Sequence, residues 1–160
     1  MATYQSFGPF EIPCRQLKKV RNIPMNWPEE WNDGPMAEFK DRKGCYVYAI
    51  KAGKGVRPWY AGKTTNAFKS EVFTADKVVR YNEVLSDLKR GKPVMYFVSP
   101  DKGSSQKIID ALEKYLIYFV YRKNPQAKQI QHVDWSVAFS DEFKKALGIE
   151  DNFLNGRKSR

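Results

Sequence analysis

The chain has 160 residues and a formal net charge of +10 at pH 7, with 28 Lys and Arg against 18 Asp and Glu. Its length suits one domain that builds its own core, and its charge favours polyanions such as nucleic acids, because each neutralised phosphate releases condensed counterions. Two cysteines and one histidine argue against a disulfide framework and a structural zinc site. The sequence has no membrane-length apolar run and no signal-peptide core, so we expect a soluble cytoplasmic protein with no membrane partner.

Residues 1–43 differ in composition from the rest of the chain, since they hold five of its nine prolines. Proline removes a backbone donor and blocks long helices, so we expect an extended N-terminal arm with a turn at 33–35. Its aromatic residues predict that the arm packs onto the core; they are Phe7, Phe10, Trp27, Trp31 and Phe39.

A hairpin is predicted next. Residues 45–50 and 58–61 are rich in β-branched and aromatic residues, and the seven residues between them include two glycines. If these two strands pair, Tyr46 and Tyr60 project from neighbouring strands onto one face of the hairpin.

Regular elements continue beyond the hairpin. The pattern predicts a short helix over 66–73, a longer helix over 76–90, a strand over 94–98 and a helix over 106–123 that ends before Asn124-Pro125. A strand over 133–138, a helix over 141–147 and a basic tail follow. We therefore expect an α+β fold, in which a small, mostly antiparallel sheet from 44–62 and 94–98 is flanked by helices.

Glu113 lies within an apolar stripe of the predicted helix over 106–123. Ile109, Leu116, Ile117 and Val120 all fall within about 60° of it at 100° per residue. A buried carboxylate is costly unless it is paired or binds a cation. Glu113 is therefore either a metal ligand on the floor of a cleft or a glutamate at the core edge that pairs with a lysine.

The tyrosines also allow two interpretations. Tyr46 and Tyr60 fit ordinary strand positions, with hydroxyls at the surface. As a pair in one hairpin followed by Lys63, they also fit a reaction site, because a cation near a phenol favours the phenolate and helps it to accept a proton from water.

Gly44-Cys45-Tyr46 and Tyr60-Ala61-Gly62, followed by Glu113 on a helix and an Asn-Pro turn, resemble the GIY-YIG nuclease family. The resemblance covers residues 44–130, between the arm of 1–43 and a C-terminal extension of 131–160. It implies a GIY-YIG-like fold and a DNA-cutting hydrolase. It also implies that Glu113 binds Mg²⁺ or Mn²⁺, and that Tyr46 or Tyr60 activates the attacking water.

The chain departs from the family pattern in two places. The family arginine that stabilises charge on the phosphate falls near Ser70, so Lys69 or Arg80 is the candidate substitute. Gln129 stands near the usual place of an asparagine that supports the site. The leading hypothesis is a metal-dependent DNA endonuclease, and the alternative is a catalytically degenerate GIY-YIG-fold module that binds nucleic acid. A third possibility is an interaction protein that binds no nucleic acid.

Basic clusters offer candidate phosphate contacts outside this motif. One comprises Arg15, Lys18, Lys19 and Arg21, and the other lies in the C-terminal tail. Such contacts position a nucleic acid without reading its sequence.

Overall fold

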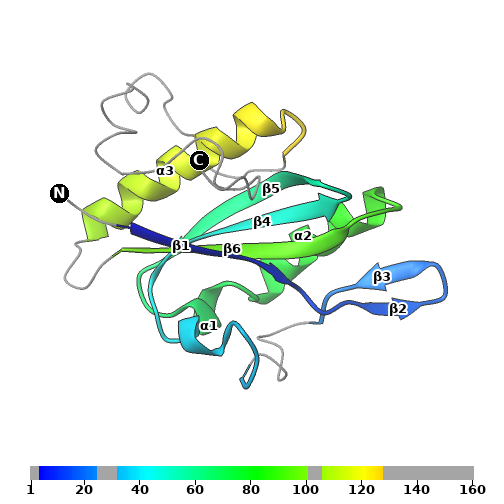
Figure 1. The fold of residues 1–160 in the computed structure, drawn as a ribbon, viewed down its shortest axis with the longest axis horizontal. Helices are drawn as coiled ribbons and strands as arrows, with labels where there is room; N and C mark the ends of the chain where they lie inside the picture. Colours follow the sequence, from blue (N-terminus) through cyan, green and yellow to red (C-terminus); the bar gives the residue numbers. More distant parts are fainter. Residues whose placement is uncertain (1–3, 25–31, 101–105, 128–160) are drawn as a thin grey trace.

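The computed structural model describes residues 4–24, 32–100 and 106–127. They form an α+β fold around a four-stranded antiparallel sheet with the strand order β1-β6-β4-β5 (Figure 1). In chain order these strands are β1 (Tyr4–Glu11), β4 (Gly44–Ala52), β5 (Gly55–Thr64) and β6 (Lys92–Pro100). The predicted class, α+β with a small antiparallel sheet, is confirmed at this level.

The predicted hairpin is the pair β4 and β5, and both strands extend beyond the predicted ranges. Tyr46 stands opposite Gly62, and Tyr48 stands opposite Tyr60. The next pair along is Ala49 with Pro58, so Trp59 is an extra residue on β5. Such a bulge bends its strand and changes the direction of neighbouring side chains. Here it lies directly beside Tyr60.

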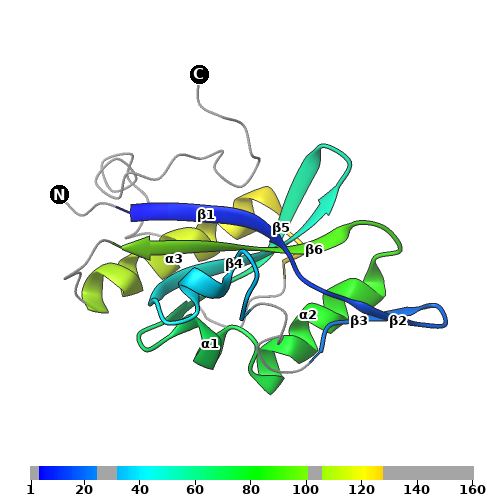
Figure 2. The ribbon, with the colours of Figure 1, turned by 60° about the horizontal axis from the view of Figure 1, so that its bottom comes forward.

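The sheet is covered on both faces. Every residue of β4 from 44 to 50 is buried, and alternate residues join two separate clusters, as the period of two in a strand requires. Tyr46, Tyr48 and Ile50 pack with α1 (Phe68–Glu71) and α2 (Ala75–Asp87), whereas Cys45, Val47 and Ala49 pack with α3 (Gln106–Lys123). Figure 2 shows α3 on the opposite side of the sheet from α1 and α2.

The helices follow the predicted order. Helix α3 has the predicted bounds, α1 is shorter than predicted, and α2 ends at Asp87 because Leu88 has an extended backbone (φ −115°, ψ 122°). The buried residues of α2 recur at helical spacing and face the sheet; they are Val78, Tyr81, Val84 and Leu85. Among the described helices, none is both long and apolar enough to cross a membrane.

The N-terminal region adds a strand to the sheet that the sequence analysis did not include. β1 pairs antiparallel with β6, from Tyr4 opposite Pro100 to Glu11 opposite Val94. The register shifts between Phe7 and Phe10, which is where Pro9 stands. A proline cannot donate to a β ladder and is tolerated on an edge strand or at an irregularity, and this position offers both.

The aromatic residues of this region pack onto the core. The ring centroids of Phe7 and Phe39 are 4.4 Å apart, and those of Phe39 and Phe97 on β6 are 5.9 Å apart. Phe39 belongs to the short 3-10 helix η2 (Ala37–Phe39). A small hairpin, β2 (Arg15–Leu17) with β3 (Val20–Asn22), precedes η2 in the chain. Trp27 and Trp31, the strand over 133–138 and the helix over 141–147 lie outside the described residues.

Candidate active site

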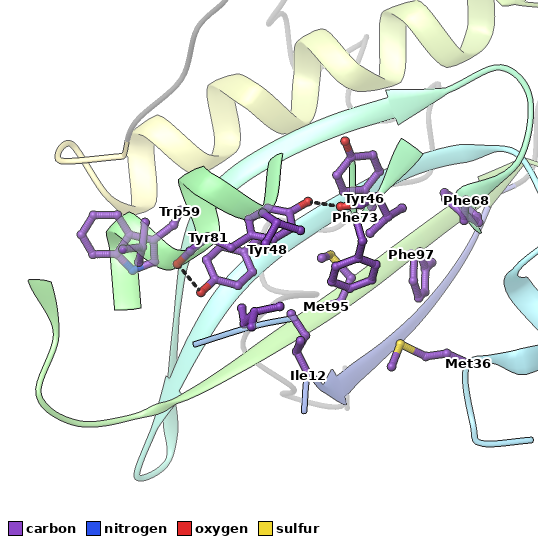
Figure 3. Packing of buried hydrophobic residues seen from close by; sticks show 14 of the residues in the cluster. Ile12, Met36, Tyr46, Tyr48, Trp59, Phe68, Phe73, Tyr81, Met95 and Phe97 are labelled. Carbon is purple, nitrogen blue, oxygen red and sulfur yellow. Dashed lines mark hydrogen bonds between the residues drawn. The ribbon is translucent and has the colours of Figure 1, made fainter. Parts of the chain in front are cut away.

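Tyr46 lies across its partner Gly62, in the cluster that Figure 3 shows. A Cβ atom at position 62 would stand 2.5 Å from the Tyr46 Oη and 2.6 Å from its Cζ. Such separations are below van der Waals contact, so the hairpin accommodates this tyrosine only beside a glycine. The glycine of each half-motif has a steric role, since a Cβ at Gly44 would collide with the Val98 carbonyl oxygen.

The Tyr46 hydroxyl is buried and makes no hydrogen bond to any residue that the structure describes. The residue has no exposed surface, and its hydroxyl has no hydrogen-bond partner within the described part of the chain. Burial raises the pKa of Tyr46 well above its ordinary value, and the nearby phenols of Tyr81 and Tyr60 add to this. A buried hydroxyl normally finds a partner, and none of the described residues supplies one here.

Tyr60 lies beside Tyr46 and reaches the surface. Their ring centroids are 6.2 Å apart, and the Tyr60 ring is 6.1 Å from that of Tyr81. The Arg80 guanidinium lies 5.9 Å from the Tyr60 ring centroid. Burial raises the pKa of Tyr60, the Arg80 guanidinium and the adjacent Tyr46 hydroxyl lower it, and the Glu113 carboxylate raises it. The two tyrosines thus share one face of the hairpin, as predicted, and Arg80 is a cation beside them.

Lys63 points to the other face, where Cys45 is its partner across the hairpin. Its Nζ lies 2.6 Å from Asp110 Oδ1 and 3.6 Å from Glu113 Oε1. The hydrogen bond to Asp110 and the charge of Glu113 raise the pKa of Lys63 against the effect of partial burial. The structure therefore directs Lys63 towards two carboxylates on α3, not towards the tyrosines.

Glu113 is only 5% exposed. Burial raises the pKa of its carboxyl group, Lys63 lowers it, Asp110 raises it and Lys77 of α2 lowers it. Although α2 and α3 lie on opposite faces of the sheet, Glu113 on α3 is within electrostatic reach of Lys77 on α2, because Glu113 lies beside the edge strand β5. The ion pair with Lys63 is the contact expected of a glutamate at the core edge, and the same carboxylate is in reach of Tyr60.

Sequence reasoning missed Asp110 and Lys77. Asp110 is three residues before Glu113, and Lys77 is three residues before Arg80, so each lies on the same helix face as a predicted site residue. Lys77 is unusually buried for a lysine, with a side chain 14% exposed and an Nζ 2.9 Å from Glu71 Oε2. The i, i+3 spacing to a candidate residue was the signal that would have found both.

The remaining candidates lie apart from this group. Lys69 pairs with Asp41 at 2.7 Å, and half of its side chain is exposed. Ser70, where the resemblance places an arginine, is also exposed. The buried Asn124 donates from Nδ2 to the Pro58 carbonyl oxygen at 2.9 Å, which ties the end of α3 to β5. Gln129 lies outside the described residues.

The donor set suits a cation held by few protein ligands. Within residues 4–24, 32–100 and 106–127, no three His, Cys, Asp or Glu side chains form a metal-binding group. Glu113 is a buried carboxylate with a second carboxylate, Asp110, one helical turn away. Mg²⁺ commonly binds through one or two carboxylates, with waters and substrate phosphates as its other ligands, so these residues fit such an ion.

Comparisons with protein-family models, with curated proteins and with solved structures found no match to this chain.

Proposed function

We propose that the chain is a metal-dependent endonuclease of the GIY-YIG type, which hydrolyses phosphodiester bonds in DNA. The observation that carries this proposal is the buried Tyr46 hydroxyl, which has no partner among the described residues and lies beside Tyr60. Leaving a buried hydroxyl unpaired costs stability. We assign the attacking water as the partner of this hydroxyl during the reaction. The net charge of +10 supports a polyanionic substrate.

In this proposal the two tyrosines have different tasks. The pKa of each is raised, so both are phenols at neutral pH. Tyr46, fully buried, orients the attacking water through its hydroxyl. Tyr60 is partly exposed and has Arg80 beside it, and this cation favours the phenolate that takes the water's proton.

Positive charge for the phosphate comes from α2. Arg80 and Lys77 are three residues apart on one face of this helix, and Lys77 is engaged with Glu71, which leaves Arg80 as the cation for the phosphate. The guanidinium offers the two-pronged donor geometry that matches a phosphate, whereas an ammonium supplies a point charge. We assign Arg80 to the role of the family arginine, because Lys69 is engaged with Asp41.

Glu113, with Asp110 near it, would hold Mg²⁺ or Mn²⁺. The ion would act there as a Lewis acid on the scissile phosphate and as a template for the substrate. Lys63 holds the two carboxylates side by side and offsets their mutual repulsion.

A second candidate function is a degenerate GIY-YIG-fold module that binds nucleic acid without cutting it. The exposed Ser70 at the expected arginine position favours this alternative, since removing one donor to a transition state lowers a rate by about a hundred- to a thousandfold.

The test is nicking of supercoiled plasmid by the wild type with Mg²⁺, with Mn²⁺ and with chelator. Glu113→Gln removes the proposed ligand, and Glu38→Gln, at an exposed site in η2, makes the same chemical change elsewhere. Metal-dependent nicking that is lost only in Glu113→Gln would support the nuclease. Salt-dependent DNA binding without nicking would support the binding module.

A further inference from the structure

A surface hollow of about 600 Å³ lies at the end of the sheet away from the candidate active site. The end of β4, its turn into β5, the loop between α2 and β6, and the end of β1 line it; the lining residues are Glu11, Lys51, Ala52, Gly53, Arg90, Gly91 and Lys92. None of the candidate active-site residues borders it. Three of the seven lining residues are cationic and one is anionic, so the hollow is suited to an anion.

The cations of the hollow are mostly available to a ligand. Lys92 makes an ion pair with Glu11 at 3.3 Å, in which both side chains are well exposed, and such a pair is weak. Arg90 and Lys51 are exposed, and within the described part of the chain neither forms an ion pair. A phosphate could therefore bind Arg90 and Lys51 without breaking a stable contact.

The loop that carries Arg90 is held in place from β3. The Arg21 guanidinium donates to the carbonyl oxygen of Gly91 and, at 2.7 Å, to that of Leu88. Arg21, a candidate phosphate contact in the sequence analysis, instead anchors this loop. A loop ordered before binding reduces the entropic cost of holding a ligand.

The hollow continues the basic surface of the β4–β5 hairpin. Residues 44–64 contain no Asp or Glu, whereas Lys54 and Arg57, which follow the lining residue Gly53 in the chain, are exposed. Lys51 follows Tyr46 by five residues on β4, about 17 Å along the strand at ~3.3 Å per residue, and this odd offset turns the two side chains to opposite faces of the sheet.

We propose that this hollow binds a backbone phosphate of duplex DNA, at the end of the β4–β5 hairpin away from the tyrosines. The site rests on the proposed function for its substrate. It would anchor the duplex along the hairpin without reading its sequence, as phosphate contacts do. Arg90 and Lys51 would bind the phosphate, and Glu11 would oppose it.

The test uses fluorescence anisotropy with a duplex of ~20 base pairs across a range of salt concentrations, in the Glu113→Gln background so that the DNA stays intact. Arg90→Ala is compared with Lys89→Ala, which removes the same charge from the adjacent, exposed residue outside the hollow. We expect Arg90→Ala to weaken binding about tenfold and to lower the slope of log K against log salt by ~0.9. Glu11→Gln should strengthen binding.

Equal effects of Arg90→Ala and Lys89→Ala on the slope, or weaker binding in Glu11→Gln, would overturn the hollow as a site. If the wild type nicks plasmid, either of these two results would overturn the hollow as a binding site and leave the proposed nuclease function standing. A slope change specific to Arg90→Ala, in a protein that does not nick DNA, would support the hollow and reject the nuclease. A wild type with no measurable affinity for the duplex would reject both.

Discussion

The ring of Tyr46 occupies the space that any side chain at position 62 would need, with Oη 2.5 Å from where a Cβ would stand. Gly62→Ala should therefore destabilise the fold by ~1–3 kcal/mol, the usual cost of overpacking a core. Urea unfolding measures this cost. Gly55→Ala on the same strand is the matched control, because its Cβ would meet only the Ala52 carbonyl oxygen at 3.7 Å.

Removing the Tyr46 hydroxyl tests the same contact from the other side. In a Tyr46→Phe background, Gly62→Ala should cost slightly less than in the wild type, since Oη is gone but the Cζ at 2.6 Å remains. Equal costs in the two backgrounds would mean that the ring and not the hydroxyl limits position 62.

Tyr46→Phe by itself should separate activity from stability. The hydroxyl has no hydrogen-bond partner among the described residues, so its removal should leave the free energy of unfolding unchanged or higher. Nicking should fall about a hundredfold or more if the hydroxyl orients the water. A clear loss of stability in urea would contradict an unpartnered hydroxyl.

The rate of nicking should rise with pH across the neutral range and beyond it. The active form of Tyr60 in the proposed mechanism is the phenolate, and burial raises the pKa of this residue above its ordinary value of 10.0. The active fraction thus grows about tenfold per pH unit below that pKa. A pH profile of single-turnover nicking measures this. A profile that levels off near neutral pH, or an unchanged profile in Tyr60→Phe, would exclude Tyr60 as the base.

Arg80 and Lys69 should differ sharply as substitutes for the family arginine. Arg80 lies beside Tyr60, whereas Lys69 pairs with Asp41. Arg80→Ala should lower the nicking rate about a hundred- to a thousandfold, and Lys69→Ala should change it little. Thermal unfolding of both variants checks that each is folded. The reverse order of effects would assign the role to Lys69.

Glu113→Gln should stabilise the fold at neutral pH and should lose the nicking activity. Burial raises the pKa of Glu113 above the ordinary 4.5, so its ionisation costs more in the folded than in the unfolded state. Below both pKa values the carboxyl group is neutral in both states, and the advantage of Gln disappears. The advantage should grow as the pH rises from 4.5 through the folded-state pKa, and chemical unfolding at several pH values would follow it. A variant less stable than the wild type at pH 7 would show that the Lys63 ion pair outweighs burial.

The sequence determined the parts of this protein that depend on local pattern. Strand and helix periodicity, with glycine and proline at the boundaries, predicted the β4–β5 hairpin, β6 and α3, because these signals act between residues close in the chain. The same periodicity placed Tyr46 and Tyr60 on one face and Glu113 in a buried stripe.

Only the tertiary structure decided how these elements meet. Proline in the first residues suggested an arm, but pairing with β6, far away in the chain, makes Tyr4–Glu11 a strand of the sheet. The sequence predicts Lys63 as a cation beside the tyrosines, yet the pleat turns it to the opposite face, where α3 supplies Asp110 and Glu113. Arg80 and Lys77 reach the site because α2 packs beside the hairpin. The partner of each of these residues is set by contacts between distant segments, and the local periodicity of a strand or helix does not specify such contacts.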